Sequence, residues 1–165
     1  MIRNQLELNG IPNDKEEVWI SIFPVSGQKN LLLKQQQSMK NLVVGFNAMN
    51  SISMLELSGL GALESVVVMR RGMIGGSGRL RVTNCANLSS IDIGEMAFTK
   101  YKNLELTNLP ILQTIKLEDS TFQNIQTIVM ESIIGDEMTN QICLLFSRFN
   151  WETTHFRETV ATDAK

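Results

Sequence analysis

The chain has 165 residues, of which 43% are hydrophobic and 19% are charged, and its formal net charge is −2. This length is sufficient for one domain with a substantial core and argues against a second one. The near-neutral charge gives no electrostatic reason to expect nucleic acid or an anionic membrane as partner. No apolar run approaches the ~18 residues of a transmembrane span, so we expect no transmembrane segment and no nucleic acid partner.

The N-terminal residues, "MIRNQLELNG", lack the basic stretch and the apolar core of a signal peptide. This favours an intracellular location, whereas a surface or secreted location is expected if the chain is a fragment of a larger protein. The two cysteines, Cys85 and Cys143, are too few for a disulfide framework and lack the spacing of metal ligands. We interpret both as buried small hydrophobic residues.

A repeat of 24 or 25 residues runs from about residue 6 to about residue 133. Its first half follows the pattern LxLxxLxxLxxIxL, in which valine, isoleucine or methionine replaces some leucines. Gln36 breaks the pattern in one copy, and Cys85 takes a leucine position in another. The copies begin at Leu31, Leu55, Leu80 and Leu104; Leu6 and Leu8 precede them in register, and Ile128, Met130 and Ile133 follow where the pattern fades.

The second half of each unit places a large apolar residue five positions after the last strand residue. These residues are Met49, Met73, Phe98 and Phe122. Alternating side chains point to opposite faces of a strand, and one unit alone cannot bury its apolar face. Stacked units bury a continuous core, so the repeat predicts a solenoid with two parallel sheets and with turns at "SGL", "TNC" and "TNL".

The glycine-rich stretch "RRGMIGGSGR", residues 70–79, raises the alternative of a phosphate-binding loop. A Walker loop requires GxxxxGK[ST] followed by a helix, whereas Arg79 here begins a strand of the repeat. We therefore interpret the stretch as the return loop of its unit. It carries the one extra residue of that unit, and glycine provides tight, left-handed backbone there.

The half-unit LxxIxLxxxxF resembles the repeat of a known protein family. The segments "LSSIDIGEMAF" (88–98) and "LQTIKLEDSTF" (112–122) resemble leucine-rich repeats, and "IGEMAF" is similar to the IGxxAF signature of the BspA-like subclass. Such a resemblance implies a right-handed solenoid whose exposed strand face binds other macromolecules. At the position where typical leucine-rich repeats carry asparagine, only Asn47 conforms; the other residues are Phe23, Arg71, Met96 and Ser120.

We therefore expect a mainly β, right-handed leucine-rich-repeat-type solenoid of about five 24–25-residue units over residues 1–135. After Ile133 the apolar residues change to helical spacing, which predicts a capping helix over residues 136–151. Such a helix covers the core and strand edges that a last coil exposes, and docking of this helix on a partner is the alternative. Residues 152–165 are polar and are predicted to form a loose tail.

The register also predicts which side chains face outward on each sheet. On one sheet the outward residues are apolar in the first units and charged in the later ones, and an exposed apolar patch marks an interaction site unless a neighbouring segment covers it. On the other sheet the outward column is Leu32, Glu56, Arg81, Glu105 and Val129, a charge ladder expected on a solvated face. The candidate partner-binding residues are Trp19, Val43, Phe46, Val67, Arg70, Asp92 and Lys116.

The sequence gives no converging set of catalytic groups. The single histidine, His155, lies in the tail, and the paired acidic residues are adjacent on strands, where neighbours point to opposite faces. We therefore expect no enzyme activity, no cofactor and no metal. The predicted function is a non-catalytic protein–protein interaction module, and the alternative is a structural protein that self-associates end to end through its solenoid ends.

Overall fold

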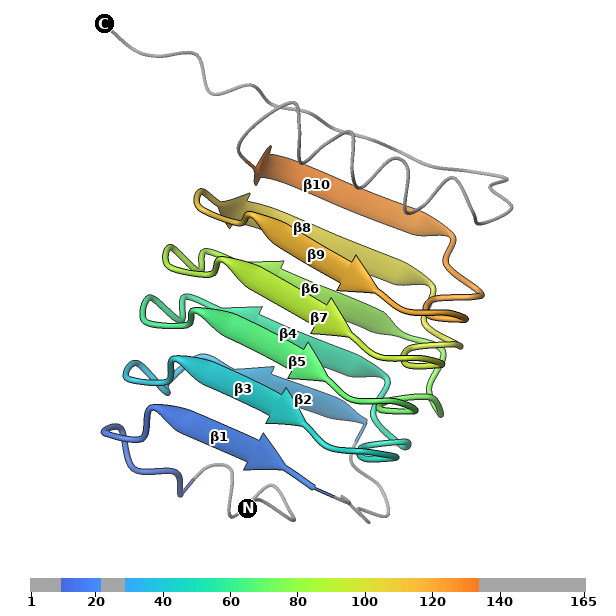
Figure 1. Ribbon diagram of the computed structural model, residues 1–165, viewed down its shortest axis with the longest axis horizontal. Coiled ribbons are helices and arrows are strands. Elements are labelled where there is room, and N and C mark those ends of the chain that lie inside the picture. The colour runs from blue at the N-terminus through green and yellow to red at the C-terminus, as the bar shows by residue number, and fades with distance from the viewer. Residues whose placement is uncertain (1–9, 22–28, 134–165) are drawn as a thin grey trace, which may run out of the picture.

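The computed structural model describes residues 10–21 and 29–133, which form two parallel five-stranded sheets (Figure 1). Sheet A contains, in order, β1 (Glu17–Ile20), β3 (Asn41–Val44), β5 (Ser65–Val68), β7 (Ser90–Ile93) and β9 (Thr114–Leu117). Sheet B contains β2 (Asn30–Leu33), β4 (Met54–Ser58), β6 (Arg79–Thr83), β8 (Asn103–Leu109) and β10 (Thr127–Ile133).

The chain alternates between the two sheets, so that each coil contributes one strand to each of them. Figure 1 shows sheet A in front of sheet B, with the coils stacked from β1 at one end to β10 at the other. The described part is therefore a β-solenoid of about four turns, from β2 through β9, with β1 and β10 at its two ends. The prediction of a mainly β solenoid with two parallel sheets is confirmed.

The strand pairing reproduces the register of the sequence repeat. Leu31 pairs with Leu55, Leu55 with Leu80, Leu80 with Leu104, and Leu104 with Ile128. The repeat that fades in the sequence after Leu117 thus continues through β10. The one extra residue of the 25-residue unit lies between Met73 and Arg79. On either side of it the backbone is in register with the previous coil, because the amide of Met73 bonds the carbonyl of Ala48 and the amide of Arg79 bonds the carbonyl of Ser53.

The inward residues of both sheets form one continuous core. Leu57, Val82 and Leu106, which stand at the same place in three successive coils, are 0%, 1% and 2% exposed. The place where Gln36 and Cys85 replace leucine is also buried, which confirms the prediction for Cys85. Full burial of one aliphatic side chain contributes about 1.5–3 kcal/mol, so the stacked columns dominate the stability of the fold.

Three aromatic residues fill the space between the sheets at the later coils. Phe98 stacks on Phe122 with ring centroids 5.0 Å apart, and it meets Tyr101 edge to face at 4.8 Å. The Tyr101 hydroxyl donates a hydrogen bond of 2.8 Å to the carbonyl oxygen of Ile52, two coils away. This bond satisfies a buried polar group, and burial raises the pKa of the phenol far above its usual range.

Left-handed backbone recurs at fixed places in every coil. Gly59, Asn84 and Asn108, in the turns predicted from "SGL", "TNC" and "TNL", have φ of 66°, 55° and 52°. Between the sheets, two further columns are left-handed although they contain no glycine; these are Asn47, Arg71, Met96 and Ser120, and Met49, Met73, Phe98 and Phe122. Non-glycine residues rarely adopt this conformation, and here backbone hydrogen bonds between successive coils hold it.

Residues 69–78 connect β5 to β6, so the stretch 70–79 forms the return loop of its unit, as predicted, and ends on the first residue of β6. The prediction of left-handed backbone at these glycines is wrong, because only Gly59 among the described glycines has a positive φ. A Cβ atom added at Gly75 or Gly78 would lie 1.5 Å from the carbonyl oxygen of Asn50 or 1.4 Å from that of Ser53. Glycine is required there because the coils approach each other too closely for any side chain.

The predicted capping helix (136–151), the tail (152–165) and Cys143 lie outside the described residues. The described part contains strands and turns, and within it no helix is long and apolar enough to cross a membrane.

Candidate functional site

The candidate site is the outer face of sheet A. Strand pairing sets Trp19, Val43, Val67, Asp92 and Lys116 side by side across β1, β3, β5, β7 and β9, one residue from each strand. Phe46 and Arg70 follow β3 and β5 by two residues. The structure therefore brings all seven predicted residues onto one surface, which we call the sheet A face.

The first half of the sheet A face is apolar. Trp19 is 44% exposed and Phe46 is 58% exposed, while Val67 is half-buried. The prediction that Val43 is exposed is wrong, because its side chain is only 8% exposed. Val43 points outward but lies between Trp19 and Val67 in register, and these larger or equal neighbours leave little of it open to water.

The indole of Trp19 is oriented by a neighbour on its own strand. Its Nε1 donates a hydrogen bond to the Glu17 carboxylate, which satisfies the one polar atom of the ring. The apolar surface of the ring thus remains exposed while its N–H is paired. This is the combination by which tryptophan contributes to interfaces, where it supplies large contact area at low entropy cost.

The second half of the sheet A face carries ion pairs, some between neighbouring coils and one within a coil. Arg70 Nε lies 3.0 Å from Glu95 Oε2, and Lys116 Nζ lies 3.7 Å from Asp92 Oδ2 and 3.1 Å from Glu118 Oε1. The hydrogen bond from Lys116, then that from the backbone amide of Glu95, lowers the pKa of Glu118, and the same contact raises the pKa of Lys116. These charged side chains form an ordered polar border beside the aromatic pair.

The outer face of sheet B carries the predicted charge ladder. Lys34 lies 2.9 Å and Arg81 3.6 Å from Glu56 Oε1, and Arg81 also lies 2.9 Å from Glu105 Oε1. The ladder is not fully solvated as expected, because Glu56 is only 8% exposed between its two cations. These charges satisfy one another and stabilise the stack of coils.

Two further exposed apolar residues lie outside the sheet A face. Leu32 on β2 and Ile111 after Pro110 are each 44% exposed. The outward position predicted for Leu32 is confirmed, whereas the sequence analysis missed Ile111, for which the repeat carries no such signal. Neither belongs to a surface with a second large exposed apolar residue, in contrast to Trp19 and Phe46 on the sheet A face.

The remaining chemically reactive side chains concern metal binding and the thiol of Cys85. Within residues 10–21 and 29–133, no three His, Cys, Asp or Glu side chains gather closely enough to hold a metal ion. Burial raises the pKa of the Cys85 thiol, and hydrogen bonds with the backbone of Leu60 and Thr83 oppose that shift. The thiol is thereby held in its less nucleophilic, protonated form.

The fold defines the class of protein as a β-solenoid repeat protein. No protein-family model, no curated protein and no solved structure matches the chain.

Proposed function

We propose that the chain is a non-catalytic interaction module that binds a protein partner through the sheet A face. The observation that carries the proposal is the pair of exposed aromatic residues Trp19, on β1, and Phe46, which follows the neighbouring strand β3. Large exposed aromatic residues on a preformed surface are typical centres of protein interfaces, because they bury much apolar area without an ordering cost.

The arrangement around the aromatic pair supports the same function. Interfaces combine a desolvated apolar centre with a polar, solvent-accessible border. Here Val67 extends the apolar area, and Arg70 with Glu95 borders it on the next strands. The charges of this border are paired already, so they favour a partner with complementary polar groups over one that supplies a single strong charge.

We further propose that the repeat is a leucine-rich repeat of the BspA-like subclass. The packing of "IGEMAF" supports this, since Ile93, Ala97 and Phe98 are at most 1% exposed. A Cβ at Gly94 would lie 2.6 Å from the backbone nitrogen of Arg70, so the second position admits only glycine. Glycine is required at this place in the coil of β7, whereas the neighbouring coils carry Met69 and Glu118 there.

Substitution of Phe46 by aspartate tests the proposed function. Partners are captured from an extract of the source cell on immobilised protein, identified by mass spectrometry and titrated as purified proteins. Because Phe46 is 58% exposed, Phe46→Asp should leave the fold intact, as judged by circular dichroism. Loss of a central aromatic contact costs about 2 kcal/mol or more, so the affinity should fall by about thirtyfold or more.

Ile111→Asp provides the matched control, because it places the same charge at a comparably exposed apolar residue away from the sheet A face. The control variant should bind as the unmodified chain does. Equal binding by Phe46→Asp and the unmodified chain contradicts the proposal. Sedimentation velocity over a dilution series tests the alternative function, end-to-end self-association. Larger species that form as the concentration rises would indicate self-assembly.

A further inference from the structure

The charges of the described residues are divided unevenly between the two sheets. Residues 10–21 and 29–133 contain eleven acidic and eleven basic residues, so their charges balance. We define the sheet A segments as each strand of sheet A with the residue before it and up to two after it, which are residues 16–21, 40–46, 64–70, 89–95 and 113–119. They hold seven of the acidic residues, Glu16, Glu17, Glu64, Asp92, Glu95, Glu118 and Asp119, and three of the basic ones, Lys40, Arg70 and Lys116. The sheet A segments are therefore acidic, and the rest of the described part is basic.

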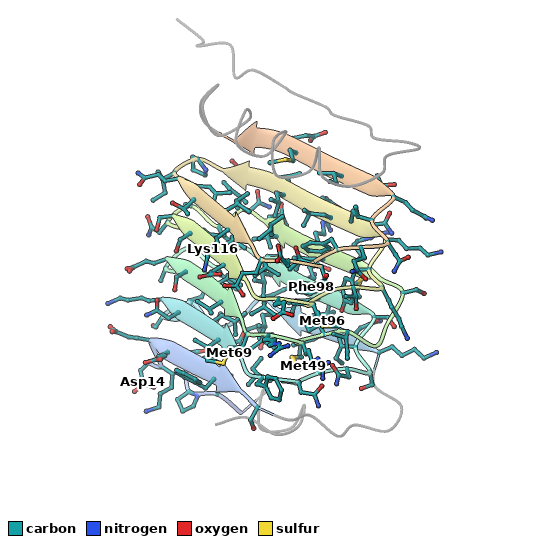
Figure 2. All side chains as sticks on the ribbon, turned by 45° about the vertical axis from the view of Figure 1, so that its right-hand side comes forward. Asp14, Met49, Met69, Met96, Phe98 and Lys116 are labelled. Carbon is teal, nitrogen blue, oxygen red and sulfur yellow. The ribbon has the colours of Figure 1, made fainter. Side chains whose placement is uncertain are left out.

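The acidic surplus reaches the sheet A face at its far end, on β7 and β9. Lys116 lies on β9 (Figure 2), and its Nζ is 3.7 Å from Asp92 Oδ2 and 3.1 Å from Glu118 Oε1. Asp119 is exposed and forms no ion pair with another described residue. Three carboxylates thus stand against one ammonium group at this end, beyond the neutral ion pair at the border of the apolar half.

The apolar and the acidic ends of the sheet A face are separated by a distance that the strand register sets. Trp19 on β1 and Asp92 on β7 stand in one column of that register, three strands apart. Phe46 and Asp119, two residues after β3 and β9, are likewise three strands apart, and backbone hydrogen bonds of 2.9–3.2 Å join the intervening loops. Neighbouring strands lie about 4.8 Å apart, so each aromatic residue has a carboxylate about 14 Å away along the stack of coils.

We infer that the protein partner of the sheet A face presents a basic segment, in which an apolar side chain and a lysine or arginine are separated by about four residues. This inference rests on the proposed function and names the chemistry of its partner. An extended chain rises about 3.3 Å per residue, so about four residues span the distance between the aromatic residues and the carboxylates. The apolar side chain contacts Trp19 or Phe46, and the cations meet Asp92, Glu118 and Asp119.

Charge complementarity favours such a partner over others. Opposite charges across an interface speed the encounter and discriminate against wrong partners, because bringing like charges together costs free energy. The surplus carboxylates repel an acidic protein surface, the phosphates of a nucleic acid and an anionic membrane, whereas they attract lysine and arginine. The aromatic residues supply most of the affinity, and the carboxylates select the partner.

Selection of a random dodecapeptide library, displayed on phage, against the immobilised chain tests the inference. The selected peptides are synthesised, and their dissociation constants are measured by fluorescence anisotropy at low and at physiological salt. These peptides should be rich in lysine and arginine, placed about four residues from an apolar side chain. Phe46→Asp should weaken their binding about tenfold or more, whereas Ile111→Asp should leave it unchanged.

The double variant Asp92→Asn with Asp119→Asn removes two of the surplus charges. It should weaken binding of the selected peptides about fivefold and make the binding less dependent on salt, because fewer ion pairs form. The matched control, Glu105→Gln with Glu131→Gln, removes the same charge from strands of sheet B and should bind within about twofold of the unmodified chain.

The outcomes separate this inference from the proposed function. Selected peptides that are neutral or acidic, and whose binding requires Phe46, overturn the basic partner and leave the interaction site in place. Equal binding by the double variant of Asp92 and Asp119 and by its control likewise overturns the basic partner alone. A selection that yields no peptide dependent on Phe46 overturns both.

Discussion

Replacement of Gly78 by alanine tests how closely the coils are stacked. Gly78 precedes β6 and lies against Ser53 of the previous coil, where an added Cβ would stand 1.4 Å from the carbonyl oxygen and 2.4 Å from the carbonyl carbon. Both atoms belong to backbone, so no side-chain rotation relieves the overlap. The loop of residues 71–79 must move away from the preceding coil.

Three backbone hydrogen bonds meet at this place, and their loss sets the size of the expected destabilisation. The amide of Arg79 bonds Ser53 at 2.8 Å, and the amides of Lys102 and Asn103 bond Gly78 at 2.9 and 3.1 Å. At about 0.5–1.5 kcal/mol each, their loss should reduce the free energy of unfolding by about 2–4 kcal/mol. Urea titration followed by circular dichroism should show the midpoint lowered by about 1–2 M.

Gly61→Ala is the matched control, because a Cβ at Gly61 meets no atom within 4 Å and φ there lies outside the left-handed region. This variant should be as stable as the unmodified chain or slightly more stable, since alanine restricts the unfolded chain. If Gly78→Ala unfolds at the same urea concentration as Gly61→Ala, the close approach of the coils at this loop is refuted.

Two further predictions concern the core. Phe98→Ala removes a fully buried ring that contacts both Tyr101 and Phe122, so it should cost about 4 kcal/mol or more in urea unfolding; a loss below about 1 kcal/mol contradicts the stacked arrangement. In a Cys143→Ser background, the Cys85 thiol should resist Ellman's reagent at pH 8 until denaturant is added, because burial raises its pKa and blocks access; rapid labelling of the folded chain contradicts its place in the core.

The repeat made most of the fold predictable. Because parallel strands of successive coils pair in register, residues that are one repeat apart in the sequence are direct neighbours in space, as are Leu55, Leu80 and Leu104. The inward and outward positions follow from strand alternation alone. The columns of the candidate site therefore follow from the repeat alone.

Predictions from the sequence were wrong where a property depends on contacts with the neighbouring coil. Val43 is outward by alternation yet 8% exposed, because its two lateral neighbours cover it. Gly78 was expected to provide left-handed backbone, but steric contact with Ser53 is what excludes a side chain there. Conversely, Arg71 and Met96 have a left-handed conformation that their residue types do not indicate.

The spacing of apolar residues by about two dozen positions is enough to specify the coil, because stacking the units buries all of them. How charge is distributed on the surface follows only from the way the coils are stacked. A net charge of −2 describes the whole chain, whereas stacking places Glu56, Glu95 and Glu118 beside cations on the two sheet faces. Electrostatic interactions depend on the distance between charges. Composition therefore gives only the sum of the charges, and the fold determines which charges lie close together.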